Sequence, residues 1–345
     1  MPLYYFCVFI ASQVTPFKRN INCILAYTPL ILISILLGLR DDTGIDDGAY
    51  AYYFSQIAIG VENFETTKFE RGYYLLNTLV MSFFDNYNII FLISSVLAAA
   101  TFIFLCEKLA VINPIVPSFA YIALTIISNH YSAVRGALSV GLMYLAVAYY
   151  TSNFKKTVFY IITIFIAAQF HTVAYFGLLS LSFFIALKYF GTRKFFIIFI
   201  LGMIGLILFK EYIFSLPEMG DALKYAENYL ELDTTTVNFM FWLTIDLGLL
   251  YMISYYSQDT NKRLFFSAFV ISHAFTMFIM PGMYIMWMRY SYLALIVAIA
   301  YMTSLNFRKE ISIIIFLLSL LYYSRNIESN GMDLLDFKLL NFGII

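Results

Sequence analysis

Long, predominantly apolar runs recur along this chain, and they constrain its fold more than any other feature. Examples are residues 21–39, 89–106 and 195–209. A helix needs about 20 such residues to cross the hydrocarbon core of a bilayer, and a backbone inside lipid must satisfy its own hydrogen bonds. Because the runs lack the period-two alternation of barrel strands, the sequence predicts an all-α fold, a polytopic integral membrane helix bundle.

The small share of charged residues supports a membrane location. Only 12% of the residues are charged and 62% are hydrophobic, whereas soluble domains carry about 25% charged residues. The net charge is zero, so nothing indicates nucleic-acid binding. Cys7, Cys23 and Cys106 lie inside apolar runs without disulfide or metal spacing, and we expect them to pack in the core.

Twelve membrane spans are expected in one transmembrane domain, 1–345. Their approximate ranges are 3–17, 21–39, 88–106, 115–129, 134–151, 157–170, 172–187, 195–210, 239–256, 264–280, 290–305 and 311–323. Several are shorter than about 17 residues, so some helices are tilted, re-entrant or joined by tight turns. The sixth and seventh spans could instead form one helical hairpin that pivots near His171.

Lysine and arginine residues are concentrated in every second connection between the predicted spans, which indicates how the bundle is oriented in the membrane. The residues concerned are Lys18, Arg19, Lys108, Lys155, Lys156, Lys188, Arg193, Lys194, Lys262, Arg263, Arg308 and Lys309. The positive-inside rule places these connections in the cytoplasm. Residues 40–87 and 211–238 then become extracytoplasmic loops. In the first loop the stretch 72–84 predicts an interfacial helix, and the acidic second loop predicts an amphipathic helix or lid.

Three arginines break this charge rule at the predicted outer ends of spans: Arg40, Arg135 and Arg289. A guanidinium group makes bidentate hydrogen bonds to phosphate oxygens and stays charged. A ring of such groups facing one outer cavity would bind a pyrophosphate. The alternative is that each arginine binds no ligand and only extends its guanidinium group to the polar surface of the membrane. His130 and His171 also lie at outer ends.

The first outer loop opens with four carboxylates, those of Asp41, Asp42, Asp46 and Asp47. One interpretation is a divalent-metal site, although the spacing does not match a calcium-binding loop. A second is that one carboxylate is a general base beside the arginines. A third is a solvated acidic turn, which the neighbouring glycines favour. The residues alone leave these alternatives open.

Other polar residues near the predicted outer boundary are candidates for binding. Glu70 precedes the interfacial stretch, in which Tyr73 and Asn77 share a helix face. Many tyrosines lie at this boundary and are typical of an aromatic belt, with stacking on sugar rings as a second use. Asp246 lies inside the ninth span, where an ionised carboxylate is costly, and we expect it to pair with a neighbouring polar group or to titrate.

Taken in order, these segments resemble the EpsG-like branch of the Wzy-type polysaccharide polymerases. The resemblance covers about residues 40–295, and Gly136 departs from the glutamine usual in the family. The matching residues are Arg40, Gly44, Asp46 and Tyr50; Glu70, Gly72 and Tyr73; Arg135 and the small residues after it; Phe170, His171 and Thr172; and Met288, Arg289, Tyr290 and Tyr292.

The resemblance implies a glycosyltransferase that joins oligosaccharide repeat units carried on undecaprenyl pyrophosphate, with no cofactor and no metal. It implies a bacterial cytoplasmic membrane location, a site on the outer face, and a chain-length regulator as an optional partner. The expected base is Asp46, then Glu70, then His171. The expected pyrophosphate ligands are Arg40, Arg71, Arg135 and Arg289, and the expected glycan contacts are Tyr50, Tyr73, Asn77, His130 and Tyr292.

Other functions remain open from the sequence. A transporter or flippase of lipid-linked saccharides would need charge near the bilayer midplane, where Asp246 is the one candidate. An O-antigen ligase shares the donor chemistry of a polymerase, although the order of the elements favours the polymerase. A membrane acyltransferase would need a paired histidine and aspartate, or a second histidine, in the membrane.

Overall fold

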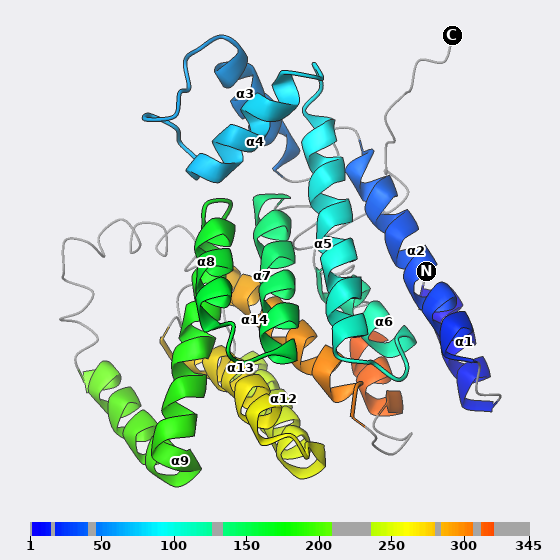
Figure 1. Ribbon diagram of the computed structural model, residues 1–345, viewed down its shortest axis with the longest axis vertical. Helices are drawn as coiled ribbons and strands as arrows, with labels where there is room; N and C mark the ends of the chain where they lie inside the picture. Colours follow the sequence, from blue (N-terminus) through cyan, green and yellow to red (C-terminus); the bar gives the residue numbers. More distant parts are fainter. Residues whose placement is uncertain are drawn as a thin grey trace. The chain divides into compact units, whose positions relative to one another are not determined.

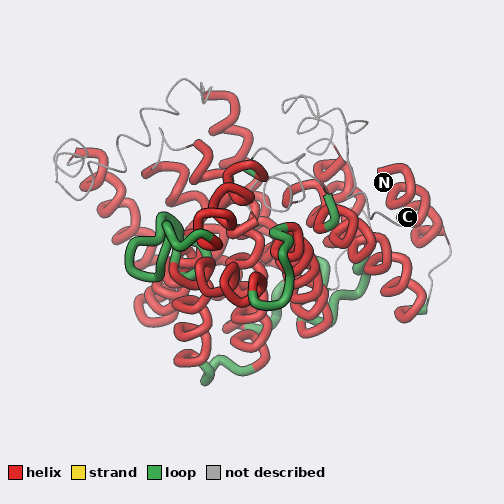
Figure 2. Tube along the Cα trace, turned by 90° about the horizontal axis from the view of Figure 1, so that it is seen from above, coloured by secondary structure: helices red, strands yellow, loops and turns green. Residues whose placement is uncertain are grey.

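The computed structural model describes residues 2–14, 18–40, 46–125, 134–208, 236–279, 284–305 and 312–320. All regular structure in these ranges is helical, and none of it is a strand (Figure 2). The predicted all-α class is therefore confirmed. The chain forms two compact units, one made of Met1–Tyr175 with Ile299–Ile345 and the other of Phe176–Ala298.

The first unit is organised around the long helix α5 (Asn88–Lys108), which packs against α2 (Arg19–Gly38) and α7 (Val134–Ser152). α8 (Thr157–Ala168) packs on α7 and leads into a 3-10 turn, Thr172–Ala174. The helices α1 (Pro2–Val14) and α6 (Ile115–Thr125) contact each other and α2. Small residues allow α5 and α7 to approach closely, since a Cβ atom added to Gly141 on α7 would lie 3.0 Å from the Cα atom of Ala98 on α5.

Two short helices of this unit lie at one end of the long ones. α3 (Asp47–Ala58) and α4 (Arg71–Met81) contact each other and lie beyond the ends of α7 and α8 (Figure 1), and α4 contacts α5. The predicted stretch 72–84 is therefore helical, with slightly different bounds. The sequence analysis did not predict α3. Which side of a membrane these helices face stays a prediction.

Apolar side chains are exposed on the outward face of α8, as lipid contact requires. On α8, Val158 is 69% exposed and Ile162 is 52% exposed, while Tyr160 on the opposite face is fully buried. A helix that is hydrophobic all round is typical of a membrane span. By length and composition, Arg19–Gly38, Asn88–Lys108 and Thr172–Gly202 are long and apolar enough to cross a bilayer.

The second unit contains most of α9 (Tyr175–Leu208), together with α12 (Thr236–Tyr256), which packs on α13 (Thr260–Ile279). Gly191 interrupts α9 with φ 71° and ψ 160°, a conformation that only glycine adopts easily. This break separates the predicted spans 172–187 and 195–210. α14 (Tyr284–Met302) begins in this unit and ends in the first.

Each of the twelve predicted spans overlaps a helix, the last one at residues 312–320. The ends differ by a few residues, since apolar runs fix the body of a helix better than its ends. The number of helices that cross the membrane stays a prediction. Most of the predicted lid, 211–238, lies outside the described residues.

Candidate functional site

The site begins where α4 meets the end of α8. The amide of Tyr73 donates a hydrogen bond to the carbonyl oxygen of Gln169 over 3.2 Å. A Cβ atom added to Gly72 would lie only 2.7 Å from that oxygen, so glycine is required for this approach. The contact fixes the first turn of α4 beside His171, two residues further along the chain.

Arg135, in the first turn of α7, forms an ion pair with Glu70, which directly precedes α4. The guanidinium group lies over the Phe69 ring, 4.0 Å from its centroid, and 5.9 Å from that of Tyr73. The two charged side chains remain 18% and 20% exposed. Arg135 is therefore oriented by a carboxylate, supported by aromatic rings and still reachable from outside the protein.

The rings below Arg135 form a buried aromatic cluster, which consists of Tyr50, Tyr53, Phe69, Tyr73 and Phe91. Burial raises the pKa of the Tyr73 phenol well above its usual value, so this group stays neutral. The cluster supplies Arg135 with a rigid apolar support.

Three residues that were predicted to contact the glycan lie in or beside this aromatic cluster. Tyr50, Tyr73 and Asn77 are between 0% and 4% exposed, so they present no open face to a sugar ring in this conformation. The Nδ2 group of Asn77 donates to the carbonyl oxygen of Tyr73 over 2.7 Å. Their glycan-binding role stays a prediction.

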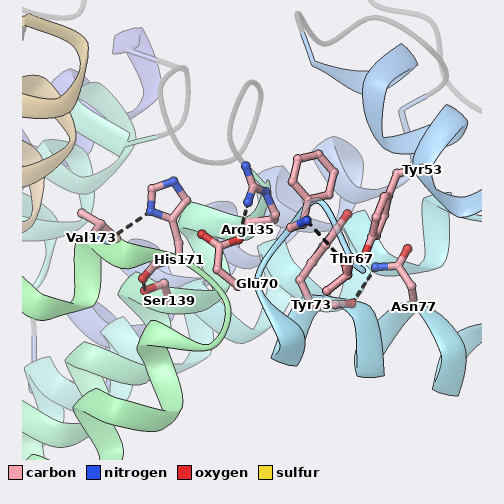
Figure 3. Close-up of polar contacts among 10 residues, drawn as sticks. Tyr53, Thr67, Glu70, Tyr73, Asn77, Arg135, Ser139, His171 and Val173 are labelled. Carbon is pink, nitrogen blue, oxygen red and sulfur yellow. Dashed lines mark hydrogen bonds and ion pairs between the residues drawn. The ribbon is translucent and has the colours of Figure 1, made fainter. Parts of the chain in front are cut away.

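His171 lies close to the Glu70–Arg135 pair. Its carbonyl oxygen accepts a hydrogen bond of 3.0 Å from the Ser139 hydroxyl, one turn after Arg135 on α7. Its Nδ1 accepts a hydrogen bond of 3.1 Å from the amide of Val173. Figure 3 shows the Glu70 carboxylate between the His171 ring and the Arg135 guanidinium group. The fold thus brings together three residues that the sequence analysis selected.

Arg40 has a different environment. Its Nε and Nη2 donate to the two carboxylate oxygens of Asp47 over 2.9 and 2.7 Å, and Nη1 donates to the Leu37 carbonyl over 2.8 Å. Both charged side chains are 0% exposed, and Arg40 also lies over the Phe91 ring. A pyrophosphate would reach Arg40 only after this ion pair opened. Asp46, the preferred base, is half-buried directly before α3.

The remaining predicted ligands are described only in part. Arg71 is exposed, and its guanidinium group lies 5.1 Å from the centroid of the Phe64 ring. Arg289 and Tyr292 belong to α14, but their side chains lie outside the described residues, as does His130 entirely. Among the described residues, no group of three or more metal-ligating side chains is present. The absence of metal stays a prediction, since Asp41 and Asp42 are not described.

The sequence analysis expected a polar partner for Asp246 but did not identify that partner, which is His273 in the second unit. His273 on α13 contacts both carboxylate oxygens of Asp246 on α12 through Nδ1, over 2.7 and 2.8 Å. Both side chains are buried, and the Trp242 ring lies 6.1 Å from the imidazole. Asp246 therefore has the polar neighbour that its position required. The sequence feature that could have identified His273 is the presence of a histidine inside an apolar run.

These observations define an all-helical membrane protein with a partly exposed, carboxylate-bound arginine at the end of one helical unit. The sequence profile of the EpsG family matches residues 23–338, and the chain belongs to this family. No curated protein and no solved structure matches the chain. Family membership confirms the resemblance and supports a role like that of a membrane polysaccharide polymerase, with glycosyltransferase-like activity.

Proposed function

We propose that the protein polymerises oligosaccharide repeat units carried on undecaprenyl pyrophosphate, at the outer face of the bacterial cytoplasmic membrane. The EpsG family match supports the polymerase class. The observation that carries the substrate assignment is Arg135, which Glu70 orients and Phe69 supports while part of it stays exposed. A guanidinium group held in this way suits phosphate oxygens, which it binds with planar, bidentate geometry.

In the proposed reaction, a hydroxyl oxygen of the acceptor unit attacks the anomeric carbon of the donor chain. The bond between that carbon and the phosphate oxygen breaks, and its electron pair leaves with the lipid pyrophosphate. Arg135, together with Arg71, would stabilise the charge that develops on the leaving group.

A base accepts the proton of the acceptor hydroxyl, and Asp46 remains the first candidate. The Glu70 carboxylate already binds Arg135, and the Nδ1 atom of His171 already accepts the Val173 amide. Asp46 lies at the start of α3, one helical turn before Tyr50 of the aromatic cluster. The arginines would stabilise the negative charge of the pyrophosphate leaving group, so the proposed reaction requires no metal and no cofactor.

One observation supports a second candidate, a membrane acyltransferase. The buried Asp246–His273 pair has the contact that orients an imidazole in acyl-transfer sites. An O-antigen ligase would use the exposed Arg135 in the same way as a polymerase, and a flippase could use the buried Asp246. Family membership favours the polymerase over the acyltransferase.

The test is to delete the gene and to separate the surface glycan of the cells by size. A polymerase mutant is expected to carry single repeat units in place of a ladder, and the wild-type gene should restore the ladder. An acyltransferase mutant would keep the ladder and lose an acyl ester, and a ligase mutant would accumulate polymer on the lipid. An unchanged, fully acylated ladder would rule out both candidates.

A further inference from the structure

The protonation of His171 follows from a single hydrogen bond. The amide of Val173 donates to Nδ1 over 3.1 Å, and an amide N–H has no lone pair with which to accept. Nδ1 is therefore the acceptor nitrogen, and the proton of the neutral imidazole is on Nε2. In this tautomer Nε2 is a hydrogen-bond donor and has no lone pair for the proton of a substrate hydroxyl.

The position of the imidazole is fixed from several directions. His171 is 8% exposed, and its carbonyl oxygen binds the Ser139 hydroxyl on the same helix as Arg135. The preceding segment is held by the hydrogen bond between Tyr73 and Gln169 and by the close approach of Gly72. A donor anchored in this way loses little freedom when it binds an anion, which is the requirement for a preorganised electrostatic site.

Glu70 has a matching role on the other side of Arg135. Its carboxylate is bound by the guanidinium group, so it neutralises and aligns that charge rather than accepting a proton. Figure 3 shows this carboxylate between the imidazole and the guanidinium group. Two kinds of donor group, the N–H groups of Arg135 and the Nε2–H group of His171, therefore belong to side chains on either side of one positioning carboxylate.

We propose that His171 donates a hydrogen bond from Nε2 to a phosphate oxygen of the substrate, beside Arg135, and is not the base of the reaction. The inference rests on the proposed function, because it assigns the phosphate group of the same substrate. The proton stays on Nε2 throughout, so His171 stabilises charge on the leaving pyrophosphate without a proton transfer of its own. Glu70 is the positioning residue for Arg135.

The experiment uses full-length protein in lipid nanodiscs, with a synthetic polyprenyl-pyrophosphate-linked repeat unit as substrate. His171→Asn keeps a side-chain acceptor for the Val173 amide but has no donor at the Nε2 position. His171→Gln places an amide donor near the Nε2 position and lacks any group that could act as a base. His171→Ala removes both functions, and inorganic pyrophosphate serves as the binding probe.

We expect His171→Ala and His171→Asn to lose about 100-fold in rate, the loss typical of one removed oxyanion donor. Both should bind inorganic pyrophosphate more weakly than the wild type. His171→Gln should stay within about tenfold of the wild-type rate, the value of one neutral hydrogen bond. Its rate should fall at low pH as the wild-type rate does, because the base is another group.

Two results would overturn the proposal. In the first, His171→Gln is as inactive as His171→Ala, while all variants bind pyrophosphate like the wild type, which would make His171 the base. In the second, His171→Asn keeps the wild-type rate, which would limit His171 to supporting the turn. A wild-type protein that makes no polymer from this substrate, yet binds pyrophosphate through His171, would contradict the proposed function alone.

Discussion

Two arginines of the first unit, Arg40 and Arg135, are both paired with carboxylates near the start of a helix, yet their environments differ. Arg40 and its partner Asp47 are 0% exposed, and its Nε and both Nη atoms donate to protein oxygens. Arg135 and Glu70 keep about a fifth of their surface exposed, and aromatic rings support the guanidinium group. The comparison separates a pair that is fully enclosed by the fold from a pair that stays partly open to solvent.

The strongest test of this difference is Arg135→Ala. We expect the rate of polymerisation to fall about 100- to 1,000-fold, since one charge-stabilising group would be lost from the transition state. The measurement is the amount of polymer formed per molecule of inserted protein. Arg135→Lys keeps the positive charge but lacks the planar guanidinium group, so its rate should lie between those of the wild type and Arg135→Ala. Full activity of Arg135→Ala would remove Arg135 from the site.

A substitution in the buried Arg40–Asp47 pair should lower the stability of the protein rather than its rate of polymerisation. Asp47→Ala leaves the Arg40 charge buried without its carboxylate, which typically costs about 3–5 kcal/mol. We expect a large fall in the thermal unfolding temperature in detergent and in the amount of folded protein.

The matched control for Asp47→Ala is the double variant Arg40→Met with Asp47→Leu. It removes both charges and should recover most of the lost stability, because a buried pair often contributes little beyond an apolar replacement. A double variant that is folded but makes no polymer would place Arg40 at the substrate and break the comparison.

A smaller effect is expected from the contact that positions Glu70. In Gly72→Ala, the new Cβ atom would overlap the Gln169 carbonyl oxygen, so the first turn of α4 must move. We expect a loss of about 1–3 kcal/mol in stability, as for other overpacked sites, with a fall in polymer formed per folded molecule. The control is Gly48→Ala, where no atom of the described residues lies within 4 Å of the new Cβ atom. Equal behaviour of the two variants would contradict the assigned role of Gly72.

The smallest effect is expected from removal of divalent metal. The Asp47 carboxylate is bound by Arg40, which reduces its capacity to hold a cation. We expect EDTA to leave the rate of the purified protein unchanged. A loss of activity that Mg²⁺ or Ca²⁺ restores would instead assign a metal to the acidic segment beside Arg40.

The positions of the long helices could be predicted from the sequence because apolar runs determine them. α5 begins at the residue where the predicted span begins. α3 could not be found in this way, since its residues 47–58 mix polar, aromatic and small side chains without a long apolar run. Packing against α4 stabilises it, and no local pattern encodes that packing.

The candidate site could be predicted as a set of residues but not as a set of contacts. Positive charge at the outer end of a span selected Arg135, and a place at an outer end selected His171. Glu70 was selected because it precedes the interfacial stretch, and the fold brings the three residues together. Positive charge at an outer end also selected Arg40, which the structure shows fully buried against Asp47. The sequence gives no indication that Arg40 is buried and Arg135 is partly exposed. The burial of Arg40 depends on side chains from other helices, such as the Phe91 ring.

The Glu70–Arg135 pair joins residues that are 65 positions apart along the chain. The turn that holds α4 in place, at Gln169, is synthesised later still. Contacts of such long range require closure of large loops, so they form late in folding. A nascent chain that ends after α7 would contain both charges without the segment that docks α4. The order of synthesis therefore delays assembly of the proposed anion site until Gln169 has been synthesised.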